Sequence, residues 1–550
     1  MKRFVFLCSL VMPCLVSVDA STPSCAPPIF ARISDEDSVA FSDALVSICA
    51  TTSAFVLQEM SPLSDKAASF TRVVTSSDGQ PPIQLDIHAQ VLLDGVLNGD
   101  PYCIRMICRA STDSLDCHTA QSMRDAANFY KLHADVHPYY AFEYARSLLL
   151  GKGVAQNVQL AANYLLKATL EGHPVAQYVC YNYVSQRFKR YRDLLQSGVV
   201  RVFALKCLQQ SADQGFVPAQ STYGCHLHTQ GEYQNAVEYF KRSARQGDAN
   251  AQYNYGIYLS EGRYVTPRKS LAAYLFKLSA NKGVSEAQYN YGVCLRDGNG
   301  VAKDLRAAAH YFGLAANQGN PQAQLNYGCA LAKGQDIEQN LEKAAHFFRQ
   351  SADQGNAEAQ CNYGVCLFLG NGVPVDQSTA VRYFKMAADQ GHADAKCNYG
   401  ICLQEGLGVA KDVDMALNYF RESALAGNAM GQYNYGMSLK NGRGVAVNMG
   451  EAVNFFRLAA EQGCSPAQLE YGAALAQGQG VAANLTEAAR FFKLSADQGN
   501  ANAQYNYGVC LLYGMGVPID QDGAVRYFRL AADQGNASAS SCLELLASRA

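Results

Sequence analysis

This 550-residue chain lacks several features that would mark a nucleic-acid-binding protein or a membrane protein. Tryptophan is absent, and 45 Lys and Arg against 47 Asp and Glu give a formal net charge of −2. A chain without a broad basic field is not expected to bind nucleic acid. After residue 20, no stretch is long and apolar enough to predict a membrane span. These absences leave a chain that is 49% hydrophobic and able to build a large core.

Motifs of the common catalytic sites are also missing. The sequence has no His-Glu-x-x-His, no Gly-x-Ser-x-Gly and no glycine-rich loop that ends in Lys followed by Ser or Thr. The ten His are scattered, and we interpret them as ordinary, half-exposed helix residues. The sequence therefore predicts no enzyme, no cofactor and no metal.

The first 20 residues have the layout of a secretory signal peptide. Lys2 and Arg3 precede the apolar run 4–18, and Val18-Asp19-Ala20 suits cleavage after Ala20. The alternative is an uncleaved membrane anchor, although the run is short for one. We expect the mature chain to be exported, to a periplasm, the extracellular space or a secretory-pathway lumen.

Glycine pairs recur along most of the chain. The stretch GNGVPVDQ at 370–377 has relatives with the pattern Gly-x-Gly-Val starting at residues 151, 298, 406, 442, 478 and 514. A second glycine series, at 247, 283, 319, 355, 391, 427, 463, 499 and 535, has a step of 36 residues and defines eight units. A phosphate loop is needed once, whereas a fixed period of this length indicates a solenoid, with each glycine pair forming a turn.

One unit, 356–391, shows how each repeat is expected to fold. Residues 357–369 predict a first helix, helix A, because Ala359, Tyr363 and Leu367 form one apolar stripe. Gly370 suits a left-handed helix end, and Asp376 suits the start of a second helix, helix B, over about 378–389. Gly364 inside helix A costs about 1 kcal/mol relative to Ala. We expect it to let an aromatic side chain of helix B reach bare backbone.

These units resemble the Sel-1-like repeat, a tetratricopeptide-like helical hairpin. The shared features are Ala-Gln before the mid-helix Gly, the Gly-x-Gly-Val turn, the Asp cap, Ala-x-x-x-Phe in helix B and Ala-Ala-x-x-Gly at its end. One difference is systematic, because Tyr-Gly-x-x-Leu replaces the family's Leu-Gly-x-x-Tyr, a swap that conserves core volume. The resemblance implies an all-α, right-handed α-solenoid of about eleven stacked hairpins that takes part in protein–protein interactions.

The predicted organisation has three parts. Residues 1–20 are the signal peptide, 21–117 are a degenerate cap or a small helical domain, and 118–550 are the solenoid with a closing helix from about 537 to 548. The array is less regular at its start, with an insertion around 185–200. A catalytic function hidden in 21–117 is a third, minor hypothesis.

Seventeen cysteines follow the signal peptide, an odd number for an exported chain. The family resemblance implies helix-to-helix disulfides in some members, but no helix B of a regular unit here has Cys. We expect the repeat cysteines to be small apolar residues packed between helices. Better disulfide candidates are Cys25, Cys49, Cys103, Cys108 and Cys117. Cys103 to Cys117 with His118 give only a weak hint of zinc.

A row of asparagines is the candidate binding feature. The residue before the stripe Tyr is Asn in seven of eight regular units, with Glu470 as the exception; we call Asn254, Asn290, Asn326, Asn362, Asn398, Asn434 and Asn506 the Asn row. Each amide offers a donor and an acceptor to an extended peptide, and the adjacent Tyr253, Tyr289, Tyr433 and Tyr505 could add contact area. Two alternatives stay open: the same Asn could hold adjacent repeats together, or the Tyr and Asn face could bind a carbohydrate or envelope polymer. We expect a monomeric scaffold with protein partners bound in the groove of the solenoid.

Overall fold

The computed structural model describes residues 120–190, 198–334 and 337–547. Within these ranges the chain forms 24 α-helices and no strand. The chain divides into two compact units, residues 1–267 and 268–550. An all-helical fold follows from the 36-residue period, because each repeat is long enough for two short helices and two turns.

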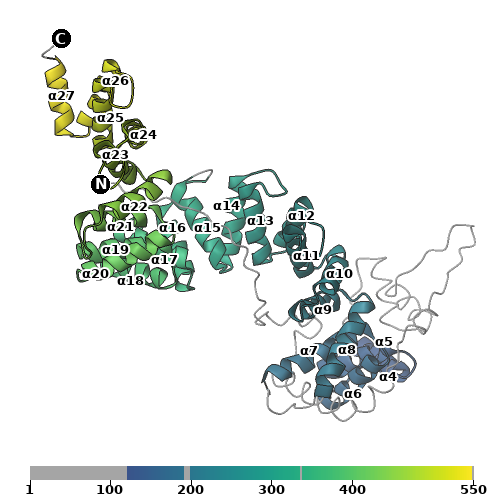
Figure 1. Ribbon diagram of the computed structural model, residues 1–550. Coiled ribbons are helices and arrows are strands. Elements are labelled where there is room, and N and C mark those ends of the chain that lie inside the picture. The colour runs from purple at the N-terminus through teal and green to yellow at the C-terminus, as the bar shows by residue number, and fades with distance from the viewer. Residues whose placement is uncertain (1–119, 191–197, 335–336, 548–550) are drawn as a thin grey trace, which may run out of the picture. The chain divides into compact units, whose positions relative to one another are not determined.

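In the first unit, consecutive helices pack against one another (Figure 1). They are α4 (Ala120–His133), α5 (Pro138–Leu150), α6 (Val158–Leu170), α7 (Pro174–Arg190), α8 (Gly198–Asp213), α9 (Val217–Thr229), α10 (Tyr233–Arg245) and α11 (Ala249–Glu261). The predicted irregular start of the array appears here, where α7 is 17 residues long and α9 is joined to α10 by a short turn.

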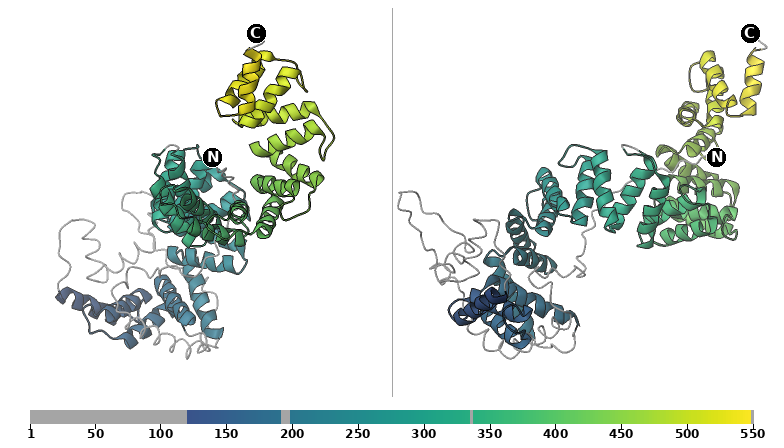
Figure 2. Two further views of the ribbon diagram at one scale, coloured as in Figure 1. Left: turned by 90° about the vertical axis from the view of Figure 1, so that its left-hand side faces the viewer. Right: turned by 180° about the vertical axis from the view of Figure 1, so that it is seen from behind.

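In the second unit, helices A and B alternate in consecutive antiparallel pairs (Figure 2). They are α12 (Lys269–Asn281), α13 (Ser285–Asp297), α14 (Leu305–Asn317), α15 (Pro321–Lys333), α16 (Leu341–Asp353), α17 (Ala357–Leu369), α18 (Gln377–Asp389), α19 (Ala393–Glu405), α20 (Val413–Leu425), α21 (Ala429–Asn441), α22 (Met449–Glu461), α23 (Ser465–Gln477), α24 (Leu485–Asp497), α25 (Ala501–Tyr513), α26 (Gln521–Ala532) and α27 (Ala537–Ala547). The predicted solenoid of 36-residue helical hairpins is confirmed.

In the unit 356–391, capping residues set the limits of the helices as the sequence predicts. Helix α17 ends at Gly370, whose φ is 76°, a left-handed conformation that favours glycine. Asp376 begins α18 by accepting a hydrogen bond from the backbone N–H of Thr379 at 3.0 Å. Asn484 has the same capping role for α24. Turn chemistry, rather than a ligand, therefore explains the glycine pairs.

The glycine inside helix A is explained by the approach of helix B. A Cβ atom on Gly364 would lie 2.7 Å from Cε1 of Phe384 and 3.2 Å from the carbonyl oxygen of Ala380. Phe384 is buried, and its ring lies directly on the bare backbone of helix A. The expected close approach is confirmed, and the same contact recurs at Gly292, Gly328, Gly400, Gly436, Gly472 and Gly508.

The core between helices A and B consists of alanine, aromatic residues and thiols. The stripe Tyr363 meets Tyr383 of helix B edge to face, with ring centroids 5.0 Å apart. Cys366 and Cys402 are free and buried, as expected for thiols that pack between helices. All twelve cysteines that the structure describes are free. The five disulfide candidates and the hint of zinc lie outside the described residues, as do the signal peptide and segment 21–117.

Candidate functional site

The Asn row lies near the middle of the A helices α11, α13, α15, α17, α19, α21 and α25. Each of its residues is half-buried, because it precedes the stripe position by one residue and so lies at the edge of the buried stripe. The side chains of the row are therefore partly accessible to solvent, as a binding surface requires. Its hydrogen bonds decide how much of it is available to a ligand.

Three of the amides contact a cysteine sulfur of the preceding helix A, and the first of these contacts joins Nδ2 of Asn254 to Sγ of Cys225 at 3.8 Å. The Nδ2 of Asn398 contacts the Sγ of Cys361 at 3.7 Å, and the Nδ2 of Asn434 contacts the Sγ of Cys397 at 3.3 Å. Each contact joins the middle of one helix A to the helix A before it. A thiol sulfur is a weak acceptor, so these contacts hold the amides loosely. Burial raises the pKa of Cys361, and the hydrogen bond from Asn398 opposes this only in part, so the acceptor is a neutral thiol.

Asn326 is committed more firmly to the fold. Its Oδ1 accepts a hydrogen bond from Nη1 of Arg296 at 2.8 Å, and its Nδ2 donates to the carbonyl oxygen of Gln322 at 2.8 Å. Glu470 replaces Asn in the row and forms an ion pair with Lys440, with Nζ and Oε2 2.6 Å apart. Lys440 occupies the same position in its repeat as Arg296. At these two positions the row links neighbouring repeats, as the structural alternative predicts.

Other members of the row keep hydrogen-bonding capacity. Asn290 and Asn506 are half-buried and form no side-chain hydrogen bond with another described residue. The Nδ2 of Asn362 is buried and has no hydrogen-bond partner among the residues that the structure describes. In the preceding repeat, the position of the accepting cysteine is occupied by Leu325, which has no acceptor. The row is therefore mixed, with some amides used for stacking and others uncommitted.

The four tyrosines beside the row are half-buried. The ring of Tyr289 packs on Phe312 of its own helix B with centroids 5.9 Å apart, and Tyr505 packs on Phe528 at the same distance. Burial is the main reason that the pKa of Tyr505 is raised. These rings therefore serve the hairpin core and expose only part of their surface beside the row.

Buried glutamines, whose role the sequence analysis missed, join the repeats. The Nε2 of Gln360 donates to the carbonyl oxygen of Ala352 at 3.2 Å, and its Oε1 accepts from Nε2 of Gln390 at 2.8 Å. Equivalent Gln pairs are 214–177, 246–220, 318–288, 354–324, 462–432, 498–468 and 534–504. At one repeat Lys396 replaces the glutamine and pairs with Glu422, with Nζ and Oε2 2.8 Å apart. The bond from Gln360 to Ala352 crosses to the preceding repeat and fixes the register between the two, whereas each Gln pair lies within one repeat and joins helix A to the end of helix B.

The described residues contain no group of three or more His, Cys, Asp or Glu side chains placed to hold a metal ion. In that same part of the chain, no helix combines the length and the apolar character that a membrane crossing requires. The predictions of no enzyme and no cofactor remain predictions.

Comparison with known proteins identifies the repeats. The model of the Sel1 repeat matches eleven segments, 138–173, 198–216, 228–248, 249–284, 285–320, 321–356, 357–392, 393–428, 429–464, 465–500 and 501–536. No curated protein matches the chain. Among solved structures, a protective antigen of uropathogenic Escherichia coli that displays an SLR fold is similar, with 25% identity over 77% of this chain and 91% of that chain and a TM-score of 0.47.

A Sel1 repeat protein from Oxalobacter formigenes is 30% identical over 56% of this chain and 89% of that chain, with a TM-score of 0.42. A putative Sel1 repeat protein from Klebsiella pneumoniae is 20% identical over 36% of this chain and 97% of that chain, with a TM-score of 0.26. The matched repeats cover most of residues 138–536 and coincide with the observed hairpins. The chain belongs to the Sel1 repeat family.

Proposed function

We propose that this chain is a non-catalytic scaffold that binds extended protein segments on the face of its A helices that carries the Asn row. The observation that carries the proposal is the pair Asn290 and Asn506, which are half-buried and form no side-chain hydrogen bond within the described part of the chain. An amide with a free donor and a free acceptor can pair with both polar groups of a peptide backbone. Stacked helical repeats present such groups at regular spacing along an extended surface.

A rigid support favours this function. The buried glutamines of the A helices donate to an alanine carbonyl oxygen of the preceding repeat and fix each repeat on its neighbour, so a bound segment would not have to order the scaffold. The all-helical Sel1 repeat is of the tetratricopeptide-like kind that commonly serves protein interaction.

Export is a separate part of the proposal and rests on the sequence of residues 1–20 alone. Its test is N-terminal sequencing of the protein recovered from the expressing cell and its surroundings. A mature chain beginning at Ser21 supports export with cleavage. An intact Met1 on a membrane-bound chain supports the anchor instead.

The binding proposal is tested by cross-linking capture with matched asparagine variants. The double variant Asn290→Ala/Asn506→Ala should retain its helical circular dichroism signal and its stability, but should lose the protein captured by the wild type. The control Asn326→Ala removes an amide that the fold uses, so it should lower stability more than it lowers capture. Retention of the same partner by the folded double variant would refute the role of the Asn row.

The alternative, a carbohydrate or envelope polymer, is separated by the class of ligand. Half-exposed tyrosine rings beside amides would also suit a sugar. Glycan arrays and peptide arrays probed with the same protein distinguish the two. Binding to glycans that the double variant loses would replace a protein partner with a polymer.

A further inference from the structure

Three successive repeats of the second unit carry side-chain acceptors that the described part of the chain does not use. They are the Oδ1 atoms of Asn362 on α17, Asn398 on α19 and Asn434 on α21. Cysteine sulfurs of the preceding repeat take the Nδ2 of Asn398 and of Asn434, and the Nδ2 of Asn362 is buried. No described residue donates a hydrogen bond to any of the three oxygens, and none of the three is buried. Each oxygen is therefore an accessible acceptor, one in each repeat.

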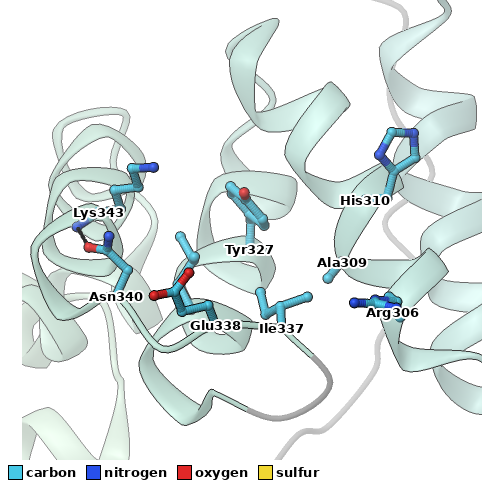
Figure 3. A pocket seen from close by; sticks show the side chains of 9 residues that line it. Arg306, Ala309, His310, Tyr327, Ile337, Glu338, Asn340 and Lys343 are labelled. Carbon is cyan, nitrogen blue, oxygen red and sulfur yellow. Dashed lines mark hydrogen bonds between the residues drawn. The ribbon is translucent and has the colours of Figure 1, made fainter.

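The set of accessible acceptors has a clear limit on each side. One repeat earlier, the Oδ1 of Asn326 accepts from Arg296, and one repeat later, Glu470 is paired with Lys440. The pocket in Figure 3 is lined by Tyr327 and not by Asn326, so it lies outside this surface. The surface spans three repeats, and we call its three residues the acceptor row: Asn362, Asn398 and Asn434.

An apolar row runs beside the acceptor row. Val365, Ile401 and Met437 each lie three residues after an acceptor, on the same face of the helix. All three are half-buried and pack on the hydrophobic core. The half-buried ring of Tyr433 adds aromatic surface next to Asn434. A segment bound here would therefore meet polar acceptors along one side and apolar side chains along the other.

The spacing of the acceptors follows from the packing of the A helices. The closest Cα atoms of α19 and α21 lie within 8 Å of each other, and the contact of Asn398 with Cys361 joins α17 to α19. The axes of packed helices lie about 8–10 Å apart, so successive acceptors, at the same place on their helices, are separated by about that distance.

This spacing selects the conformation of a bound segment. In an extended β-strand, N–H groups that face the same way recur every two residues, or about 6.7 Å. In polyproline II, equivalent N–H groups recur every three residues, or about 9.3 Å. Only the polyproline II period matches one acceptor in each repeat.

We propose that the acceptor row binds a proline-rich segment with the repeat Xaa-Pro-Pro in the polyproline II conformation. This proposal rests on the proposed function, since it names the kind of segment that the A-helix face binds. The backbone N–H of each Xaa donates to one Asn Oδ1. The two prolines between successive Xaa residues have no N–H and need no acceptor, and their rings pack on the apolar row. Polyproline II has no internal hydrogen bonds and is already ordered, so its N–H groups are available and little entropy is lost on binding.

Synthetic peptides test the donor and its period with the wild-type full chain. The probe is fluorescein-labelled (Ala-Pro-Pro)4, and fluorescence anisotropy measures its affinity. Replacing every Ala by N-methylalanine removes the donors, so affinity should fall by about tenfold or more. The peptide (Ala-Pro)6 has a donor at every second residue, and (Ser-Val)6 favours an extended strand. Both should bind more weakly than (Ala-Pro-Pro)4.

Two double variants separate the acceptor role of the amides from their packing role. Asn398→Ala/Asn434→Ala removes two acceptors together with their contacts to cysteine, and should weaken binding of (Ala-Pro-Pro)4 by roughly fivefold or more. Cys361→Ala/Cys397→Ala breaks the same two contacts but keeps both acceptors, so it should bind nearly as the wild type does. Circular dichroism should confirm native helicity in both variants. If the asparagine variant does not fold, the peptide series on the wild type still decides.

Several outcomes would overturn the proposal. They are no saturable binding of (Ala-Pro-Pro)4, equal affinity for its N-methylated form, tighter binding of (Ala-Pro)6 or (Ser-Val)6, or equal losses in the two folded double variants. Any of these outcomes can occur while Asn290→Ala/Asn506→Ala still loses a protein that the wild type captures. In that case the proposed function stands and the proline-rich ligand is wrong. If the wild type captures no protein and binds none of the peptides, both proposals fail.

Discussion

Replacing Gly364 by Ala tests whether the mid-helix glycine exists to admit the helix B ring. Helix propensity alone favours Ala by about 1 kcal/mol. The added Cβ, however, would lie 2.7 Å from the Phe384 ring and 3.2 Å from the Ala380 carbonyl oxygen, and neither neighbour is the end of a flexible side chain. Overpacking of this kind costs about 1–3 kcal/mol, and two simultaneous contacts place it in the upper part of that range. We expect a net loss of about 1–2 kcal/mol.

Hydrogen exchange measured by mass spectrometry is the suitable assay, because long repeat arrays do not unfold as one cooperative unit. Amides of α17 and α18 should exchange about five to thirty times faster in Gly364→Ala. The matched control is Gly450→Ala, since Gly450 is exposed in α22 and its Cβ would have only one neighbour, at 3.8 Å. That control should stabilise its helix by roughly 0.5 kcal/mol. If both substitutions stabilise their helices, the close-approach argument is wrong.

Three further predictions follow from the contacts between and within repeats. Gln360→Leu should destabilise the repeat by about 1–3 kcal/mol, seen as faster exchange in α17, because the buried Gln360 loses its hydrogen bonds to the Ala352 carbonyl oxygen of the preceding repeat and to Gln390. His392 caps α19 by accepting from a backbone N–H, and burial lowers its pKa, with Asp394 opposing in part. A lowered pKa means that the unfolded state binds more protons than the folded state. The stability from His392 is therefore present above its unfolded pKa and is lost as pH falls through the folded pKa. His392→Asn should keep the cap, and hydrogen exchange measured across this pH range should no longer show the loss of stability. Burial raises the pKa of Cys366 and Cys402 to about 11, so both should resist iodoacetamide at pH 8 in the native chain and react after denaturation, as counted by mass spectrometry.

Much of the fold follows from local sequence. Helix A of the unit at 356–391 has the bounds predicted for it, because its stripe, its glycine end and its cap all lie within one repeat. The close approach at Gly364 was also predictable, since only a tight packing contact offsets the helix cost of glycine.

The use of the Asn row was not predictable from one repeat alone. Asn398 and Asn362 occupy the same repeat position, yet one contacts Cys361 and the other has a buried amide without a partner. The difference depends on whether the preceding repeat offers a cysteine or Leu325, which only the stacking register reveals. The same register brings Gln360 to the carbonyl oxygen of Ala352 in the preceding repeat, so Ala-Gln was visible as a motif but its role was not.

Site-specific photo-cross-linking tests the central claim, that the A-helix face binds protein, most directly. A photoreactive residue replaces Val293 or Val509, each half-buried and one turn from an uncommitted Asn, or replaces Arg382 on helix B as a control. The proposed function predicts protein cross-links from 293 and 509 and none from 382. Cross-links from 382 alone, or none from 293 and 509 in a folded chain that still captures its partner, would contradict it.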